Sequence, residues 1–249
     1  MPLTSALFRS TLVFILVIAF PIGKALADTI NIAAENSWSP YSDHLGLGIT
    51  HDIVSAAFAV TGHTITIEAL PYSRVLRHTA NGVADAGWNV TREKSTESIF
   101  TFGTEPLFQA VASHYFPPGQ AKLFSNARNI PEGTKIGVML NYEYGDDFSA
   151  NIYRFELTEV KSQTQLIRML ASGRIDMAIM FDDIAEFTLK EMGWPSSAIV
   201  KGNSNHVSDI YLAFNKDSSK SVQYAADLDR GLRQIKSDDT FKEIFSTYR

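Results

Sequence analysis

The sequence predicts an α/β fold made of two lobes of related build. Three observations lead to this: strand and helix patterns alternate along the chain, one helix-to-strand segment occurs twice, and two strand-like segments are placed to join the halves. The chain has 249 residues, and the about 222 that follow residue 27 suit one large domain or two small lobes. A hydrophobic content of 45% is ordinary for a globular protein.

The first half begins with a buried strand over residues 29–34. Gly48 then leads into a helix, which we expect Thr50 or Asp52 to cap and Gly62 to end. Residues 63–70 alternate apolar and polar side chains, which is typical of a strand. A short helix follows from Ser73, and the second half repeats the pattern with strands at 135–140, 157–160 and 177–180 and a helix at 163–171.

The repeated segment has the same layout in both halves. A short helix starts with the pattern Arg-x-Leu and ends at Gly82 or Gly173, and Asp85 or Asp176 stands three residues later, before a strand of small residues. Glycine suits the positive φ at a helix end, and the aspartate can accept from backbone amides at the strand start. Any helix-to-strand turn can use such residues, but two copies about ninety residues apart favour two related lobes.

Residues 107–116 and 206–215 are strand-like and contain no glycine. Two crossings of one boundary predict a hinge between discontinuous lobes. We expect lobe one to hold residues 28–109 and 206–249, lobe two to hold 115–205, and 110–114 to form the first crossing. Closing helices follow from Tyr224 onward, and Asp238 and Asp239 are placed to cap the last of them.

The N-terminus has the pattern of an export signal. Arg9 precedes an apolar run at 11–20, and Ala25-Leu26-Ala27 fits the small-x-small cleavage rule. The alternative is a membrane anchor, but a spanning helix needs about twenty apolar residues. The sequence therefore predicts a signal peptide over 1–27, a mature start at Asp28 and a periplasmic location.

Composition excludes several classes of function. The chain has no cysteine, so it has no lipid-modified cysteine, no disulfide, no zinc-thiolate site and no catalytic thiol. Residues 1–27 hold two basic and no acidic residues, so 20 basic and 27 acidic residues remain after them, a net charge of −7. Such an acidic chain is a poor partner for nucleic acid or an anionic membrane.

No cofactor or metal site is expected. His51 stands where a dinucleotide-binding motif starting at Gly46 needs its third glycine, and there is no phosphate-binding loop or nucleophile elbow. The six histidines include no pair at the i, i+3 or i, i+4 spacing of metal ligands.

Candidate binding residues follow the strands of the first half, because ligands in open α/β sheets lie beyond the carboxyl ends of strands. These candidates are Glu35, Trp38, Tyr41, Tyr72, Arg74, Trp88, Asn89 and Arg92. Arg92 is the best carboxylate clamp, since a guanidinium binds a carboxylate through two hydrogen bonds. Its alternative role is a surface ion pair with Glu93 or Glu97, and the aromatic residues could instead pack within their own lobe.

The second half supplies Asn141, Tyr142, Glu143 and Asp182 as candidates. Asp182 could accept a ligand ammonium, and Asp183 is better placed to cap the helix that follows.

The order and spacing of these segments resemble the periplasmic solute-binding proteins of ABC importers, of the polar amino-acid-binding type (bacterial extracellular solute-binding protein family 3). The resemblance covers nearly all of the chain after residue 27. It rests on ENSWSPYSD, on Gly48 with Asp52, and on PYSRVLRHTANGVADAG, TFGTEPLF, LIRMLASGRIDMAI and DLDRGLRQIKSDDTFKEIFSTY.

The resemblance implies a type II periplasmic-binding-protein fold with a ligand between the lobes. It assigns ligand contacts to Glu35, Trp38, Tyr72, Arg92 and Asp182. This sequence departs from the family in three places: Arg92 lies farther from Phe102 than the family's arginine does, Asn141-Tyr142-Glu143 replaces an amide-donating turn, and Phe181 stands where the family has its aspartate.

The predicted function is capture of a small polar solute, an amino acid or similar, by lobe closure. A monomer would deliver it to a membrane permease or a sensor, without catalysis. Two alternatives stay open: a dehydratase-like enzyme on the same scaffold, with Glu35, Glu143 or Asp182 as the acid, and a signalling lobe that binds nothing small.

Overall fold

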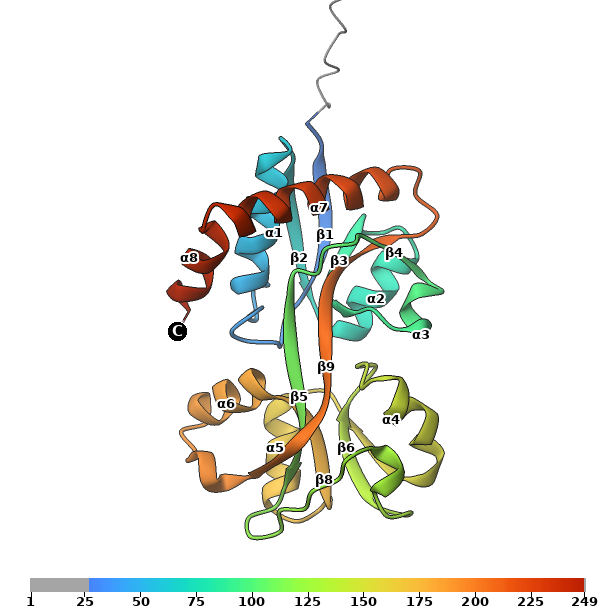
Figure 1. Ribbon diagram of the computed structural model, residues 1–249, viewed down its shortest axis with the longest axis vertical. Helices are drawn as coiled ribbons and strands as arrows, with labels where there is room; N and C mark the ends of the chain where they lie inside the picture. The colour runs from blue at the N-terminus through green and yellow to red at the C-terminus, as the bar shows by residue number, and fades with distance from the viewer. Residues whose placement is uncertain (1–26, 249) are drawn as a thin grey trace, which may run out of the picture.

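The computed structural model describes residues 27–248. The predicted signal peptide, with its apolar run and the first two residues of its cleavage motif, lies outside the described residues. Two lobes are stacked along the long axis of the molecule and joined by two long strands that run side by side, β5 (Phe108–Phe116) and β9 (Val200–Asn215) (Figure 1). No described helix is both long enough and apolar enough to span a membrane.

One mixed sheet runs through both lobes in the order β2-β1-β3-β9-β5-β8-β6-β7, and β4 pairs with β9. The remaining strands are β1 (Thr29–Glu35), β2 (Thr64–Leu70), β3 (Ala86–Thr91), β4 (Phe100–Phe102), β6 (Lys135–Met139), β7 (Glu156–Val160) and β8 (Met177–Phe181). In each lobe three strands are parallel, and a crossing strand adds an antiparallel neighbour: β9 beside β3, and β5 beside β8. The two lobes therefore have the same arrangement of strands. The antiparallel neighbour is β9, the second crossing strand, in lobe one, and β5, the first crossing strand, in lobe two.

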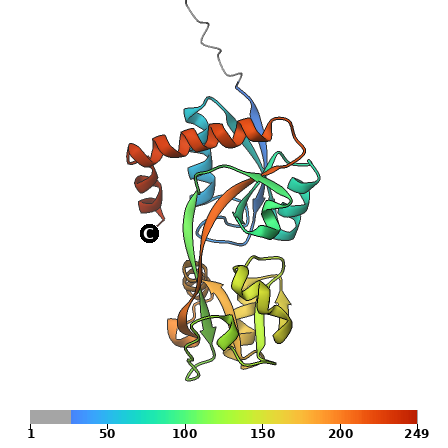
Figure 2. The same cartoon turned by 45° about the vertical axis from the view of Figure 1, so that its right-hand side comes forward.

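Helices cover the sheet in both lobes. Lobe one has α1 (Ile49–Val60), α2 (Tyr72–Ala80), α3 (Lys94–Glu97), α7 (Ser221–Ser237) and α8 (Thr240–Thr247), and lobe two has α4 (Asp146–Asn151), α5 (Gln163–Ala171), α6 (Asp182–Glu191) and the short 3-10 turns η1 (Ala127–Asn129), η2 (Ile152–Arg154) and η3 (Ser196–Ala198). The long helix α7 lies across lobe one and returns the chain from the second crossing, as the turned view shows (Figure 2). Gly231 of α7 meets the backbone of Ala57 in α1 so closely that a Cβ there would lie 1.9 Å from the Ala57 carbonyl oxygen.

The repeated glycine–aspartate pattern has the same geometry in both lobes. Gly82 and Gly173 have φ values of +70° and +69° after α2 and α5. The Asp85 carboxylate accepts from the Asn31 amide at 2.9 Å, and the Asp176 carboxylate accepts from the Lys135 amide at 2.9 Å. Each aspartate therefore joins the start of its own strand to the first strand of its lobe.

The predicted strands and helices are present, but three expected caps are wrong. Helix α1 begins after Gly48, and Thr50 and Asp52 lie inside its first turn, where their side chains bond Asn89 (2.7 Å) and Tyr248 (2.8 Å) instead. Helix α6 begins one residue before Asp183, so this side chain also falls within the first turn.

The last helix is capped by one of its two predicted aspartates. Asp239 occupies the cap position of α8 with φ 67° and makes no capping side-chain bond. The Asp238 carboxylate accepts from the Thr240 amide at 3.2 Å in its place.

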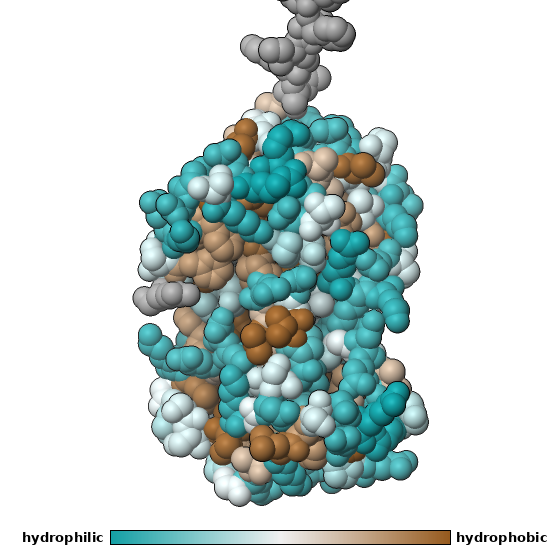
Figure 3. Space-filling view, in the orientation of Figure 1, coloured by the Kyte–Doolittle hydropathy of each residue, from teal (hydrophilic) through white to brown (hydrophobic). Residues whose placement is uncertain are grey.

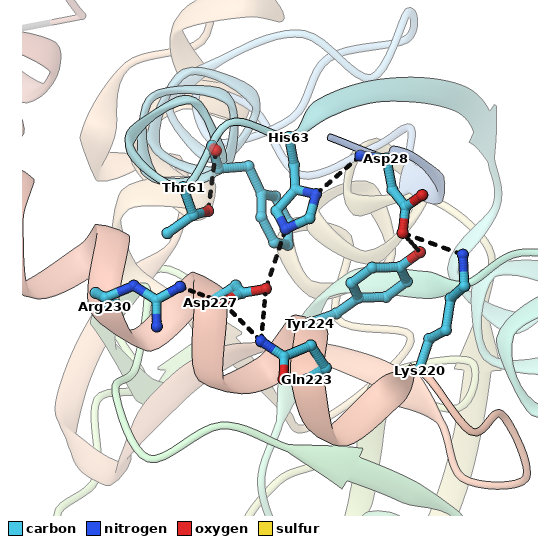
Figure 4. Close-up of polar contacts among 9 residues, drawn as sticks. Asp28, Thr61, His63, Lys220, Gln223, Tyr224, Asp227 and Arg230 are labelled. Atoms are coloured by element: carbon cyan, nitrogen blue, oxygen red, sulfur yellow. Dashed lines mark hydrogen bonds and ion pairs between the residues drawn. The ribbon is translucent and has the colours of Figure 1, made fainter. Parts of the chain in front are cut away.

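The start of the described chain is tied to α7 (Figure 4). The Asp28 amide donates to His63 Nδ1 at 3.2 Å, and His63 Nε2 contacts the buried Asp227 carboxylate at 3.0 Å. The Asp28 carboxylate accepts from Lys220 Nζ at 3.0 Å and from the Tyr224 hydroxyl at 2.9 Å. Because Nδ1 accepts a hydrogen bond, His63 carries its proton on Nε2 and donates it to Asp227.

Candidate functional site

A small cavity lies where the two lobes meet. Its volume is about 10 Å³, the space of about one water molecule. Both lobes contribute residues at or shortly after the ends of their strands. The residues from lobe one are Glu35, Trp38, Tyr72, Asn89 and Thr91, and those from lobe two are Tyr142, Glu143 and Phe181. The cavity therefore sits at the carboxyl ends of the parallel strands of both lobes, where ligands bind in open α/β sheets.

Two hydrogen bonds cross the cavity in opposite senses. The Tyr142 hydroxyl of lobe two donates to the Glu35 carboxyl of lobe one, and the Tyr72 hydroxyl of lobe one donates to the Glu143 carboxyl of lobe two at 2.7 Å. The two tyrosine rings meet edge to face, with their centroids 4.9 Å apart. We call these four residues the Tyr–Glu cross. It places one acid and one phenol from each lobe at the junction.

Both carboxyls of the Tyr–Glu cross are hard to ionise. Burial raises the pKa of Glu35 to about 8, against the opposing effect of hydrogen bonds from Tyr142 and Asn89. Burial likewise raises the pKa of Glu143 to about 8, opposed by the hydrogen bond from Tyr72. Burial, together with the neighbouring acids, also raises the pKa of both tyrosines well above its ordinary value. No lysine, arginine or histidine is among the lining residues.

Two asparagines in the left-handed region shape this site. Asn89 has φ 64° at an irregularity in the pairing of β3 with β9, and its side-chain oxygen accepts from the Thr50 hydroxyl at 2.7 Å. The Asn89 amide nitrogen lies near enough to Glu35 to oppose the rise in its pKa, yet it makes no hydrogen bond of normal geometry. Asn141 has φ 63° and turns the chain just before Tyr142. Asparagine tolerates this region better than most residues.

Other contacts hold the lobes together around the cavity. Trp38 meets Phe181 edge to face, with centroids 5.1 Å apart. The Tyr41 hydroxyl donates to the Asp183 carboxylate at 2.6 Å, and the Gly145 amide donates to Glu93 at 2.8 Å. The structure is thus a closed arrangement of the two lobes, which meet across the waist of the molecule on the face drawn in Figure 3.

The structure brings together six of the residues predicted from the sequence: Glu35, Trp38, Tyr72, Asn89, Tyr142 and Glu143. Six others lie outside the cavity lining: Tyr41, Arg74, Trp88, Arg92, Asn141 and Asp182. Thr91 and Phe181 line the cavity and were not among the candidates. Both stand at the last position of a strand, which is the signal that could have identified them.

Arg92 is placed on the outside of lobe one. Its Nε contacts the Glu97 carboxylate at 2.6 Å, and a second nitrogen donates to the Gly103 carbonyl at 3.2 Å. Its guanidinium also lies over the rings of Phe102 and Tyr211. The ion pair with Glu97 is the alternative considered from the sequence, and it leaves the cavity without a carboxylate clamp.

Asp182 also faces away from the cavity. Its carboxylate accepts from the Tyr115 hydroxyl at 2.9 Å and from Lys201 Nζ at 2.6 Å, both within lobe two. It lines an outer groove beside Trp194 and Ile199. Helix α6 begins at this residue, so the first helical turn directs Asp182 toward β5 and β9.

The other four outlying candidates have different settings. Trp88 is fully buried in the core, where its ring nitrogen donates to Ser42 at 3.3 Å. Tyr41 stacks on Phe108, with centroids 4.4 Å apart. Arg74 and Asn141 are exposed at the edges of outer grooves. Among the described residues, no group of three or more histidine, aspartate and glutamate side chains is suited to hold a metal ion.

Known structures share this fold over most of the chain. An ancestral arginine-binding protein bound to arginine superposes with a TM-score of 0.73 at 17% identity, covering 88% of this chain and 97% of its own. A histidine kinase sensor domain with similarity to periplasmic binding proteins gives 0.76 at 14% identity, over 88% and 95% of the two chains. The ancestral amino acid-binding protein AncCDT-1, a precursor of cyclohexadienyl dehydratase, gives 0.70 at 15%, over 88% and 94%.

No family model and no curated protein matches the sequence. At these identities the structural likenesses bear on the fold. The chain has the two-lobed, type II fold of periplasmic binding proteins, with discontinuous lobes and two crossing strands.

Proposed function

We propose that this protein captures a small polar solute between its lobes and passes it to a membrane permease or a sensor. The observation that carries the proposal is the cavity, which both lobes line through the ends of their parallel strands. The lobes are joined by two strands, so they can separate to admit a ligand and close again around it.

The Tyr–Glu cross supports a ligand-driven closure. In the closed arrangement the two tyrosine hydroxyls occupy the positions where a solute would meet the carboxyls of Glu35 and Glu143. A ligand must therefore enter an open form and replace these contacts on closure. Its effect on the open–closed equilibrium equals its differential affinity for the two forms.

The similar structures support the same class of function. One is an arginine-binding protein bound to arginine, and another is a sensor domain. We infer from this fold, together with the predicted signal peptide, that the mature protein starts at Asp28 and works in the periplasm as a monomer. An intact mass that includes residues 1–27 after export would contradict the processing step.

One observation favours a second candidate, an enzyme. A buried carboxyl with a pKa of about 8 can serve as a general acid near neutral pH, and the cavity holds two. AncCDT-1 shows that a binding protein of this fold can be related to a dehydratase. A solute that is released unchanged after incubation supports binding, and turnover with a bell-shaped pH profile supports catalysis.

Native mass spectrometry of protein purified under mild conditions tests the main proposal. We expect a retained small molecule that leaves on partial unfolding, together with a smaller radius of gyration by small-angle scattering after it is added back. A protein that retains no solute, and whose scattering profile no solute extract changes, would contradict the proposal.

A further inference from the structure

The cavity is lined by acidic side chains and by no basic one. Glu35 and Glu143 are the charged residue types that line it, and both are acids. Arg92, the basic residue that the sequence suggested as a carboxylate clamp, bonds Glu97 and the Gly103 carbonyl outside the cavity. Within the described chain, the closed site thus offers carboxyls to a ligand and no cation with which to bind one.

The aromatic side chains around these acids suit a cation as well. Trp38, Tyr72, Tyr142 and Phe181 all line the cavity. Aromatic faces attract ammonium and guanidinium groups electrostatically, and the attraction is stronger in a desolvated site. A carboxylate in the same place would lie beside two acids and four aromatic side chains, which is an unfavourable setting.

The cavity lining also contains two donors without acceptors. The Trp38 ring nitrogen and the Asn89 amide nitrogen are buried and make no hydrogen bond of normal geometry. Trp38 is 1% exposed and Asn89 is 5% exposed. Buried donors of this kind are rare in native structures, and each suits an oxygen acceptor on a ligand. A neutral oxygen fits the charge balance better than a carboxylate.

We propose that the site binds a small organic cation, with its ammonium or guanidinium group between Glu35 and Glu143 and a neutral oxygen, in place of a free carboxylate, near Asn89 and Trp38. This inference rests on the proposed function and names its ligand class. Such a site differs from one that binds the carboxylate of an amino acid. An organic cation is stabilised by the two acids, whereas a carboxylate would need a basic side chain in the lining.

Pairs of compounds that differ only at the carboxylate test the inference. Arginine and argininamide carry the same guanidinium on the same chain, and lysine and lysinamide carry the same ammonium. In isothermal calorimetry we expect each amide to bind at least about tenfold more tightly than its acid, since a buried unbalanced charge costs more than a neutral amide.

Two results would overturn the inference. One is tighter binding of either free amino acid than of its amide, and the other is no binding of either amide at millimolar concentration. The proposed function fails separately: a solute found by native mass spectrometry keeps that function even if both amides fail.

Isosteric variants locate the cation. Glu35→Gln and Glu143→Gln should each weaken argininamide binding at least about tenfold, because each removes a negative charge from the site. Glu105→Gln is the matched control, since Glu105 pairs with Arg233 and Lys236 of α7 and is not a lining residue. Thermal melting checks that all three variants fold. Unchanged affinity in both cavity variants, once folded, would also overturn the inference.

Discussion

The two acids of the cavity, Glu35 and Glu143, have partners of a different kind from two acids outside it, Asp182 and Glu97. Asp182 pairs with Lys201, and Glu97 pairs with Arg92, so both of these outer acids contact a cation. Glu35 and Glu143 each accept from a neutral tyrosine hydroxyl. The residue types are the same, but the outer charges are neutralised within the protein and the inner ones are not. The difference shows that the charge of Glu35 and Glu143 can be neutralised only by a bound proton or by a ligand, because the described part of the chain places no cation beside them.

The largest expected effect is a dependence of lobe closure on pH. The pKa of Glu35 and Glu143 is about 8 in the closed form, above its ordinary value, so closing the lobes binds protons near neutral pH. This contribution to closure is fully present below the ordinary carboxyl pKa and is lost as pH rises through about 8. Each shift corresponds to on the order of 4–5 kcal/mol. The ligand-free radius of gyration should therefore increase between about pH 5 and pH 8.

Of the groups around these carboxyls, the two tyrosines stay protonated over this range, and Glu93 changes in the same direction as Glu35 and Glu143. Tyr72 and Tyr142 have pKa values raised well above the ordinary one, and Glu93, which also faces Glu143, has a pKa that burial raises. The double variant Glu35→Gln/Glu143→Gln should therefore give a radius of gyration that changes much less over this range, with Glu93 as the remaining contributor. A profile as steep as that of the unaltered protein would show that other groups control closure.

A second test compares a tryptophan under the cavity with one on the surface. Trp38 is 1% exposed and contacts Tyr41, Phe108 and Phe181, whereas Trp194 is 36% exposed. Trp38→Ala should lower the free energy of unfolding by about 3–5 kcal/mol, because it leaves a large void. Trp194→Ala should change it by less than about 1 kcal/mol. Urea unfolding measures both, and similar losses would contradict the difference in burial.

A third test removes one hydroxyl from each region. Tyr142→Phe leaves the buried Glu35 carboxyl without its donor and should weaken lobe closure by about 1–3 kcal/mol. Tyr115→Phe removes the donor to Asp182 within lobe two and should leave the lobe arrangement unchanged. Scattering at pH 6 distinguishes the two. Opening in the Tyr115 variant alone would assign control of closure to the outer acids.

The smallest expected effect is that of the outer arginine. The Arg92 side chain is 40% exposed and pairs with a Glu97 side chain that is 45% exposed, so the pair contributes at most about 1 kcal/mol. Arg92→Ala and Arg74→Ala should each change argininamide affinity by less than about threefold. A loss above about tenfold for Arg92→Ala alone would show that Arg92 moves into the cavity on binding.

Most of the fold could be predicted from local patterns. Alternation of strands and helices, and the glycine–aspartate pairs at Gly82 with Asp85 and at Gly173 with Asp176, depend on residues near one another in sequence. The helix caps were less predictable, because a shift of one residue moves a side chain from the cap into the first turn. Thr50 and Asp183 illustrate this, since each is used by a distant partner, Asn89 and Tyr41.

The lining of the candidate site was predictable only where a side chain stands at or shortly after a strand end. Glu35, Tyr72, Tyr142 and Glu143 stand at or just after strand ends, and the fold brings those ends together. The positions of the Arg92 and Asp182 side chains depend instead on which oppositely charged residues lie within reach. Glu97 on α3 and Lys201 on β9 neutralise them outside the cavity, and Lys201 lies on a segment that no local pattern places beside α6.

Lobe one is completed by β9, the second crossing strand, and this determines the order in which the two lobes can be completed during synthesis. Lobe two is made from one continuous stretch of chain plus the neighbouring parts of β5 and β9, so most of its contacts are short in sequence. Lobe one needs β9 and α7, and the bonds from Asp28 to Lys220 and Tyr224 span 192 and 196 residues. Contacts of such separation form late, because the intervening chain must close a long loop. A chain that emerges N-terminus first therefore exposes an unfinished first lobe until nearly its last helix is available.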